Sequence, residues 1–150
     1  MRKLLTLLKK ISHEQRFVMF NPDTGIQHAN NYQLDRFISA QDSIYQSALS
    51  ELRAGYKRSH WMWFIFPQID GLGTSTTAKH YAIRSLEEAR DYLNHPVLGA
   101  RLSECTMAVV GVNGRSALDV FGSPDNLKFC SSMTFFECVA GRYSDFSHAI

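Results

Sequence analysis

The stretch LDRFISAQDSIYQSALSEL, residues 34–52, indicates most clearly which fold the chain adopts. Its apolar side chains recur every three or four residues, which is the period of a helix with one buried face. The residues on this face are Leu34, Phe37, Ile38, Tyr45, Ala48, Leu49 and Leu52. Gly55 follows as a stop signal, so the pattern predicts one helix of about 20 residues that packs on a core.

Helix-start signals recur on both sides of this stretch. Ser85 with Glu88 has the spacing of a capping box, and Ser123 is an expected N-cap before a proline and an acid. Pro96 suits the first turn of another helix. These signals, with the apolar spacing, predict helices over residues 1–12, 76–81, 86–93, 96–112, 116–121 and 124–138.

The predicted elements give an all-α fold, a compact single-domain array of six or seven helices. Residues 17–28 resemble a small N-terminal hairpin around a turn at residues 21–25. A chain of 150 residues suits one domain. We expect residues 1–32 to be an N-terminal extension and residues 33–150 to form the helical domain.

Composition excludes several classes of protein. The net charge is only +2, and residues 1–16 carry five basic side chains against one acidic, so the remaining chain is slightly acidic and unsuited to nucleic acid. The apolar run near the start is too short for a signal peptide, and no stretch reaches the roughly 18 apolar residues of a membrane span. The three cysteines fit neither a disulfide framework nor a zinc site. We therefore expect a soluble cytoplasmic protein without metal or cofactor.

Polar and aromatic side chains that suit a ligand site gather in residues 57–82. This window holds three cations, two histidines, both tryptophans and the loop GLGTSTT at residues 71–77. The loop leads into a predicted helix, whose free amides favour an anion, although the Walker ending is absent. The candidate ligand-binding residues are Lys57, Arg58, Trp61, Gly71, Gly73 and Thr74 from this window and Lys128 from a second polar cluster next to a later helix start; the candidate catalytic residues are His60 and His80.

Each of these candidates also fits a structural role. Lys57 and Arg58 suit a solvated helix end as well as a phosphate or carboxylate. The run WMWFIF at residues 61–66 suits a core, although one tryptophan turned to a cavity would stack on a ring. His60 and His80 titrate near neutral pH, which suits proton transfer, yet a hydrogen-bonded structural histidine has the same sequence signal.

Four segments carry a resemblance to a known family. They are LDRF at residues 34–37, KRSHWMWFIFPQ at 57–68, HPVLG at 95–99 and FGSPDNLK at 121–128. Together they resemble the bacterial domain-of-unknown-function family 1810, whose members often carry the label calpastatin. The resemblance covers residues 33–140 and implies a compact, mainly α-helical domain; it implies no activity.

The chain departs from the family pattern at three places. Residues 1–30 resemble nothing usual in the family. The family continues past the helix at residues 124–140 with another helix, so we expect this domain to lack its usual C-terminal helix. Cys130 stands where relatives are expected to carry an arginine, which would weaken an anion site there.

A second, weaker likeness concerns residues 69–81. Ile69-Asp70-Gly71 followed by Lys79-His80-Tyr81 is similar to the stretch around a Glu-His-Tyr motif in N-glycosidases acting on ADP-ribose and riboflavin precursors. Lys79 replaces the glutamate here. Asp70 or Asp125 would have to supply the carboxylate that stabilises an oxocarbenium-like centre.

The leading hypothesis is a domain that binds a small anionic ligand, such as a nucleotide, an ADP-ribose-like molecule or a sugar phosphate, in a pocket built by residues 57–82. The alternatives are a non-enzymatic protein-interaction or structural module and an N-glycosidase-like enzyme. The ligand hypothesis requires Lys57, Arg58, His60 and His80 to converge on one concavity. Under the interaction hypothesis they would scatter outward.

Overall fold

The computed structural model describes residues 2–14, 34–141 and 144–149. Within these ranges the chain is all-α, as predicted, and has no strand beyond one isolated bridge between Ile69 and Ile83. The elements are α1 (Arg2–Glu14), α2 (Asp35–Asp42), α3 (Tyr45–Arg53), α4 (Met62–Ile65), α5 (Thr76–His80), α6 (Leu86–Asn94), α7 (Leu98–Val110), α8 (Ala117–Phe121), α9 (Asp125–Ala140) and the 3₁₀ helix η2 (Asp145–Ala149). The predicted hairpin at residues 17–28 lies outside the described residues.

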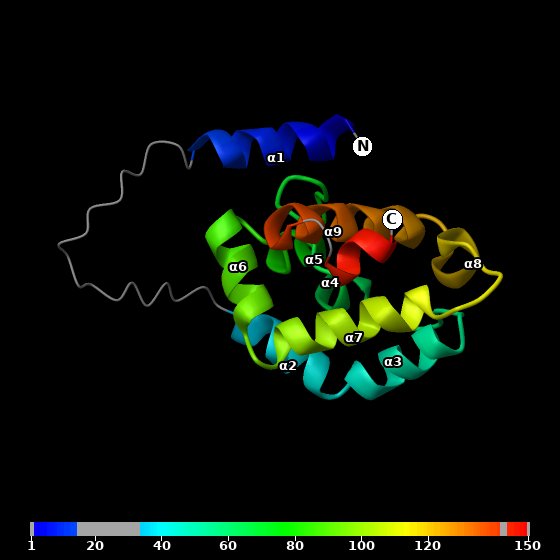
Figure 1. Cartoon of the computed structure of the whole chain (residues 1–150). Helices are drawn as coiled ribbons and strands as arrows, with labels where there is room; N and C mark the ends of the chain where they lie inside the picture. Colours follow the sequence, from blue (N-terminus) through cyan, green and yellow to red (C-terminus); the bar gives the residue numbers. More distant parts are fainter. Residues whose placement is uncertain (1, 15–33, 142–143, 150) are drawn as a thin grey trace.

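Helix α7 contacts α3, α4, α6 and η2. It packs against α3 on one side and α6 on the other, while α9 contacts α6, α8 and η2 (Figure 1). The short helix α4 lies inside, where it contacts α2, α7 and α9. Helix α1 lies along the side of the molecule formed by α9 and α5 (Figure 1). Its Leu4 is buried and belongs to the common core.

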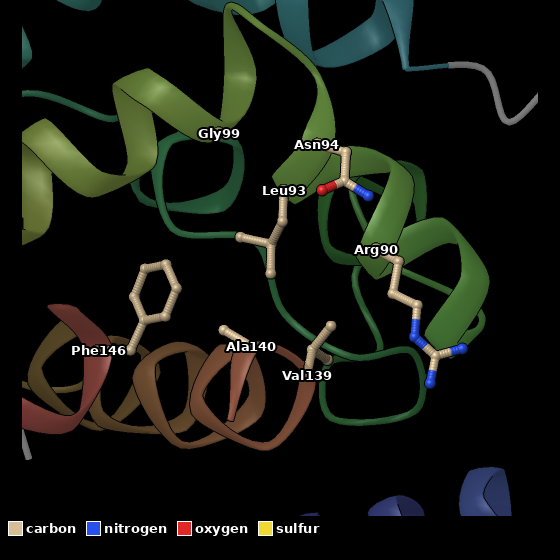
Figure 2. Close-up of a pocket in the computed structure, with 7 residues that line it drawn as sticks. All are labelled: Arg90, Leu93, Asn94, Gly99, Val139, Ala140 and Phe146. Atoms are coloured by element: carbon tan, nitrogen blue, oxygen red, sulfur yellow. The ribbon is translucent and has the colours of Figure 1, made fainter. Parts of the chain in front are cut away.

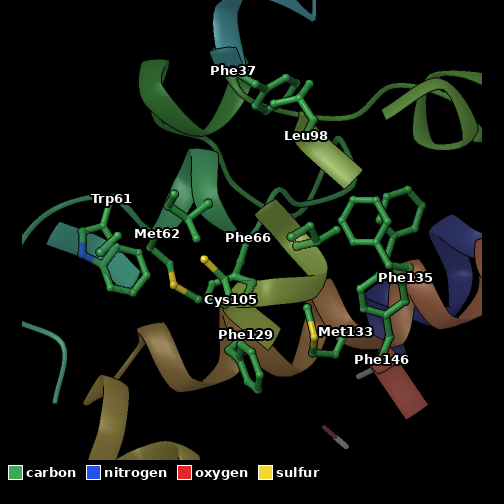
Figure 3. Packing of buried hydrophobic residues seen from close by; sticks show 14 of the residues in the cluster. Phe37, Trp61, Met62, Phe66, Leu98, Cys105, Phe129, Met133, Phe135 and Phe146 are labelled. Carbon is green, nitrogen blue, oxygen red and sulfur yellow. The ribbon is translucent and has the colours of Figure 1, made fainter. Parts of the chain in front are cut away.

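Aromatic side chains fill the core between α4, α8 and α9 (Figure 3). The ring of Phe66 meets that of Phe129 edge-on at 5.0 Å, and Phe129 stacks on Phe121 at 4.7 Å. Trp61 packs on Phe66 at 6.2 Å. Full burial of each such ring contributes about 1.5–3 kcal/mol. The run at residues 61–66 is therefore mainly core, and Trp61, Met62, Ile65 and Phe66 are all buried.

The predicted single helix over residues 34–52 is wrong, because the structure has two helices with a turn at Ser43 and Ile44. The Ile44 amide donates to the Gln41 carbonyl, three residues back instead of four. The buried Gln41 side chain donates to the Phe64 carbonyl at 2.7 Å and to the Tyr92 hydroxyl at 3.2 Å. These bonds anchor the end of α2 to α4 and α6, so the chain bends there while the buried stripe continues into α3.

Two of the predicted helix caps differ from the structure. Ser85 caps α6 as expected, but the Glu88 carboxylate accepts from the Arg84 amide and pairs with Arg36 instead of closing the box on Ser85. Pro124, not Ser123, is the N-cap residue of α9, and the peptide bond between them is cis. The splitting of residues 34–52 and the short α4 explain why the described residues contain more helices than predicted.

Candidate functional site

Two lysines converge on one carboxylate at the start of α9. Lys57 Nζ lies 2.8 Å from one oxygen of Asp125, and Lys128 Nζ lies 2.7 Å from the other. The side chains are largely buried, with exposed fractions of 8% for Lys57, 18% for Asp125 and 21% for Lys128. We call these three residues the lysine cluster. Two ammonium groups on one carboxylate leave an excess of one positive charge.

A tryptophan ring supports each ammonium group of the lysine cluster. Lys57 Nζ lies 5.1 Å from the centroid of Trp61, and Lys128 Nζ lies 4.2 Å from that of Trp63. Both separations fall within the range of a cation–π contact. The Trp63 ring is only half-buried, so Lys128 and Trp63 form the side of the cluster that a ligand can reach.

The predicted stacking role of Trp61 does not fit the structure. Trp61 is fully buried, and its indole N–H donates to the Glu51 carboxylate at 2.9 Å. Its ring faces the core, where it meets Phe121 edge-on. A ligand cannot stack on a ring without exposed area. Trp63 is therefore the tryptophan of this segment that has a free surface.

The electrostatics keep Asp125 ionised. Burial acts to raise its pKa, but hydrogen bonds from Lys128 and Lys57 outweigh burial and lower it below the usual value. A carboxylate that is charged at neutral pH holds both lysines in place. The cluster is thus a fixed arrangement of charges.

Bonds between α9 and the segment after α4 position the lysine cluster. The side-chain amide of Gln68 donates to the backbone carbonyl of Lys128, and Ser132 Oγ donates to the Pro67 carbonyl at 2.7 Å. The Lys57 amide donates to the Val120 carbonyl at the end of α8 at 2.8 Å. Three segments that are distant in sequence are fixed against one another in this way.

Glu51, in α3, orders the loop that carries Lys57 to Trp61, and sequence reasoning missed it. Its carboxylate accepts from the amides of Arg58 at 2.7 Å and Ser59 at 3.1 Å, from the Ser59 hydroxyl and from the Trp61 indole. Burial acts to raise the pKa of Glu51, yet these hydrogen bonds lower it overall. No spacing in the sequence signals this role, because the partners follow Glu51 in an irregular loop.

The glycine loop at residues 71–77 owes its glycines to packing. Gly71 has a φ of +89°, and a Cβ there would lie 3.3 Å from Leu7 of α1. A Cβ on Gly73 would lie 2.5 Å from that of Ala78. Ser75, not the exposed Thr74, caps α5, since its hydroxyl accepts from the Ala78 amide at 3.1 Å. Helix α5 is too short to add a strong dipole.

Gly73 nevertheless lies beside the lysine cluster. A Cβ on this glycine would contact the Trp63 ring at 3.4 Å, on the same side chain that Lys128 covers. Of the predicted ligand-binding residues, the structure therefore brings Lys57, Lys128 and Gly73 together, with the buried Trp61 ring against Lys57. It adds Asp125 and Trp63 to them.

The remaining candidates do not converge on the lysine cluster. Arg58, His60 and His80 are exposed. The Arg58 guanidinium lies 5.8 Å from the centroid of Tyr56, and the His80 ring meets Tyr81 edge-on at 4.6 Å. Within the described residues, no hydrogen bond or ion pair connects either histidine to Lys57 or Arg58. Of the four residues predicted to converge, only Lys57 lies in the lysine cluster.

The carboxylates proposed for N-glycosidase-like chemistry are placed as follows. Asp125 is engaged by both lysines of the cluster. Asp70 is exposed, and its backbone amide donates to the Ile83 carbonyl at 2.8 Å, next to the bridge that pairs Ile69 with Ile83. Within the described residues, no hydrogen bond connects the Asp70 carboxylate with His80. Neither carboxylate is therefore in a position that supports the predicted N-glycosidase-like chemistry.

The described residues line at least two open depressions outside the cluster. One, of about 450 Å³, lies between α6, the end of α9 and η2. Figure 2 shows Leu93 and Phe146 facing its interior while Arg90 points away from Phe146. The other, of about 480 Å³, lies beside α8 and is lined by Tyr56, Gly114, Arg115 and Asp119.

Comparisons with known proteins agree with this helical architecture. The family described as "Protein of unknown function (DUF1810)" matches residues 31–150. The chain belongs to this family. The resemblance predicted from the four sequence segments is thereby confirmed. A comparison with curated protein sequences gives no match.

A solved structure related to this DUF1810 chain is the crystal structure of a conserved hypothetical protein, Rv1873, from Mycobacterium tuberculosis. The two sequences are 53% identical, with a TM-score of 0.77. The similarity covers 79% of this chain and 84% of that one. It shows the fold and assigns no ligand.

Two properties of the described part of the DUF1810 chain bear on its class. None of its helices has the length and apolar content needed to cross a membrane. The described residues also contain no group of three or more His, Cys, Asp or Glu side chains that could hold a metal ion.

Proposed function

We propose that this domain binds a small anionic ligand, of the nucleotide, ADP-ribose-like or sugar phosphate class, at the lysine cluster. The observation that carries the proposal is the excess positive charge of Lys57 and Lys128 on the single carboxylate of Asp125. A largely buried cation without a full counter-charge favours an anion, because few water molecules reach it to compensate.

The accessible edge of the site suits a phosphate group. The Lys128 side chain is the more exposed of the two lysines, and its ammonium group has donors beyond the one directed at Asp125. A phosphate oxygen at this edge would accept from Lys128 while the half-buried Trp63 ring lies beside it. The backbone of Gly73, close to the same ring, would border the ligand. His60 and His80 are exposed in this proposal and have no assigned catalytic role.

We propose that the protein is cytoplasmic. Cys105, Cys130 and Cys138 are free thiols in the structure, which suits a reducing compartment. Burial raises the pKa of the Cys105 thiol to about 12, so this cysteine remains protonated and unreactive.

Calorimetric titration with inorganic pyrophosphate tests the proposal. Lys128→Met keeps the aliphatic length of the side chain and removes its charge, so we expect affinity to fall by about tenfold or more, the value of one charge-assisted hydrogen bond. Lys79→Met is the matched control, because Lys79 is exposed on α5 and, among the described residues, forms no ion pair with the cluster. Equal affinities for the two variants, or no binding by the unaltered protein, would refute the proposal.

A non-enzymatic interaction module is the second candidate function. Leu118 and Leu127, on the packed helices α8 and α9, are 54% and 62% exposed, which is high for leucine and suits a contact surface. Sedimentation of the purified protein over a range of concentrations tests the simplest case, contact between copies. Self-association that Leu127→Ser abolishes would support this candidate, and a monomer at every concentration would remove that case.

A further inference from the structure

The depression beside α8 combines an aromatic ring, a cation and an acceptor. Its lining residues are Tyr56 from the loop after α3, Gly114 and Arg115 from the loop after α7, and Asp119 from α8. We call it the tyrosine pocket. Figure 1 shows that the end of α3 and helix α8 lie at the same end of the array, and the bond from the Lys57 amide to the Val120 carbonyl fixes this arrangement. The volume of about 480 Å³ is in the range of small-molecule sites.

Tyr56 offers a flat surface for stacking. Its side chain is 53% exposed, so a large part of the ring faces solvent. The Arg58 guanidinium lies 5.8 Å from its centroid, close enough for a cation–π contact. A planar ligand ring that covers Tyr56 would bury apolar area that now faces solvent.

Arg115 supplies a fixed cation. One nitrogen of its guanidinium, Nη1, donates to the Gly55 carbonyl at 2.9 Å, which holds the group at the pocket. The carboxylate of Asp119 lies nearby but forms no ion pair with it among the described residues. The remaining guanidinium donors can therefore serve a phosphate, which a planar guanidinium binds well.

Asp119 supplies a hydrogen-bond acceptor, whereas Arg115 supplies donors. Its Oδ2 accepts from the Ser116 amide at 2.8 Å and from the Ser116 hydroxyl at 2.7 Å. These two bonds lower the pKa of Asp119, so the carboxylate is ionised. Its Oδ1 has no partner among the described residues and suits a hydroxyl or amine donor. A ligand that fits must carry an anion and a donor as well as a ring.

We infer that the tyrosine pocket binds a nucleoside monophosphate. The base would stack on Tyr56, the phosphate would bind Arg115 with Arg58 nearby, and a ribose hydroxyl or a base amine would donate to Asp119. A free amino acid would supply the anion and the donor but leave much of the volume empty. The inference is independent of the lysine cluster, since none of its residues lines this pocket.

Titration with adenosine 5′-monophosphate, adenosine and pyrophosphate tests the inference. The variants are Tyr56→Ala, which removes a half-exposed side chain and leaves the core intact, and Arg115→Met, checked for folding by circular dichroism. Arg90→Met, which alters an exposed arginine of the other depression, is the matched control. We expect adenosine 5′-monophosphate to bind about tenfold more weakly to each pocket variant and unchanged to the control. Adenosine is expected to bind more weakly than its monophosphate.

The outcomes separate this inference from the proposed function. Binding of adenosine 5′-monophosphate that survives Tyr56→Ala but is lost in Lys128→Met would place the nucleotide at the lysine cluster and overturn the inference. Absence of any nucleotide binding would also overturn it, whatever pyrophosphate does. Tighter binding of a free aromatic amino acid than of the nucleotide would overturn the assigned ligand class. Pyrophosphate binding that depends on Lys128 and not on Tyr56 bears on the proposed function alone.

Discussion

Replacing Asp125 by asparagine removes the one negative charge of the lysine cluster and keeps the shape of the side chain. Lys57, with 8% of its side chain exposed, then loses its ion-pair partner and lies close to a second ammonium group. Removal of one partner from a fully buried ion pair costs about 3–5 kcal/mol. Since Asp125 and Lys128 are each about a fifth exposed, solvent screening reduces this to about 2–3 kcal/mol.

Thermal and urea unfolding measure this loss. A destabilisation of 2–3 kcal/mol corresponds to a decrease in melting temperature of roughly 4–12 °C for a domain of this size. The matched control is Asp91→Asn on α6, an exposed acid with no contact to the cluster, which should change stability by less than about 0.5 kcal/mol. Addition of pyrophosphate should restore more stability to Asp125→Asn than it adds to the unaltered protein, because the variant has two uncompensated cations.

Two results would contradict this reasoning. If Asp125→Asn melts at the temperature of Asp91→Asn, the carboxylate does not hold the lysines as the distances indicate. If pyrophosphate stabilises Asp125→Asn no more than Asp91→Asn, the anion binds away from the cluster. A double variant with Lys57→Met should lose less stability than the two single changes together, since each removes the same ion pair.

Three further perturbations test other parts of the structure. Glu51→Ala leaves the buried indole N–H of Trp61 without its acceptor, so urea unfolding should show a loss of about 1–3 kcal/mol. Gly99→Ala should lower the free energy of unfolding by about 1–3 kcal/mol, measured by differential scanning calorimetry, because its Cβ would lie 2.0 Å from a carbonyl oxygen of α6. Gly111→Ala is the control; this residue has an ordinary helical φ and its added Cβ would have its nearest atom at 3.3 Å, so the free energy of unfolding should hardly change. The lowered pKa values of Glu51 and Asp125 mean that their stabilisation is complete above the unfolded values, at about pH 4.5 and 3.8, and is lost as pH falls through the lower folded values. The urea midpoint should therefore decrease below about pH 4.5, and a midpoint that rises on acidification would show that neither carboxylate is stabilised in its charged form.

The parts of the fold that depend on neighbouring residues could be predicted from the sequence. The helix predicted over residues 116–121 begins with a Ser116–Asp119 capping box, and Ser85 caps α6 as expected, because a cap needs only residues within one helical turn. The buried stripe of α7 likewise follows from its period, since Leu98, Leu102 and Cys105 are all buried. Local chemistry decides these features.

The parts that depend on distant contacts could not be predicted. The bend between α2 and α3 is held by bonds from Gln41 to residues 23 and 51 positions away, which no window of sequence reveals. The same applies to Lys57 and Lys128, which were predicted as separate cations and meet only because α9 brings Asp125 between them. The sequence does not distinguish Trp61 from Trp63, because both lie in the same apolar run. Only the packing of this segment in the folded chain shows that Trp61 is the buried one.

A titration of the ¹⁵N-labelled protein with pyrophosphate, followed by nuclear magnetic resonance, shows where the anion binds. We expect the largest shifts at the Trp63 indole and the Lys128 amide, with little change at the Trp61 indole in the core. Shifts confined to the groove lined by Leu93 and Phe146, or no shift anywhere at millimolar pyrophosphate, would contradict the assignment of the lysine cluster as an anion site.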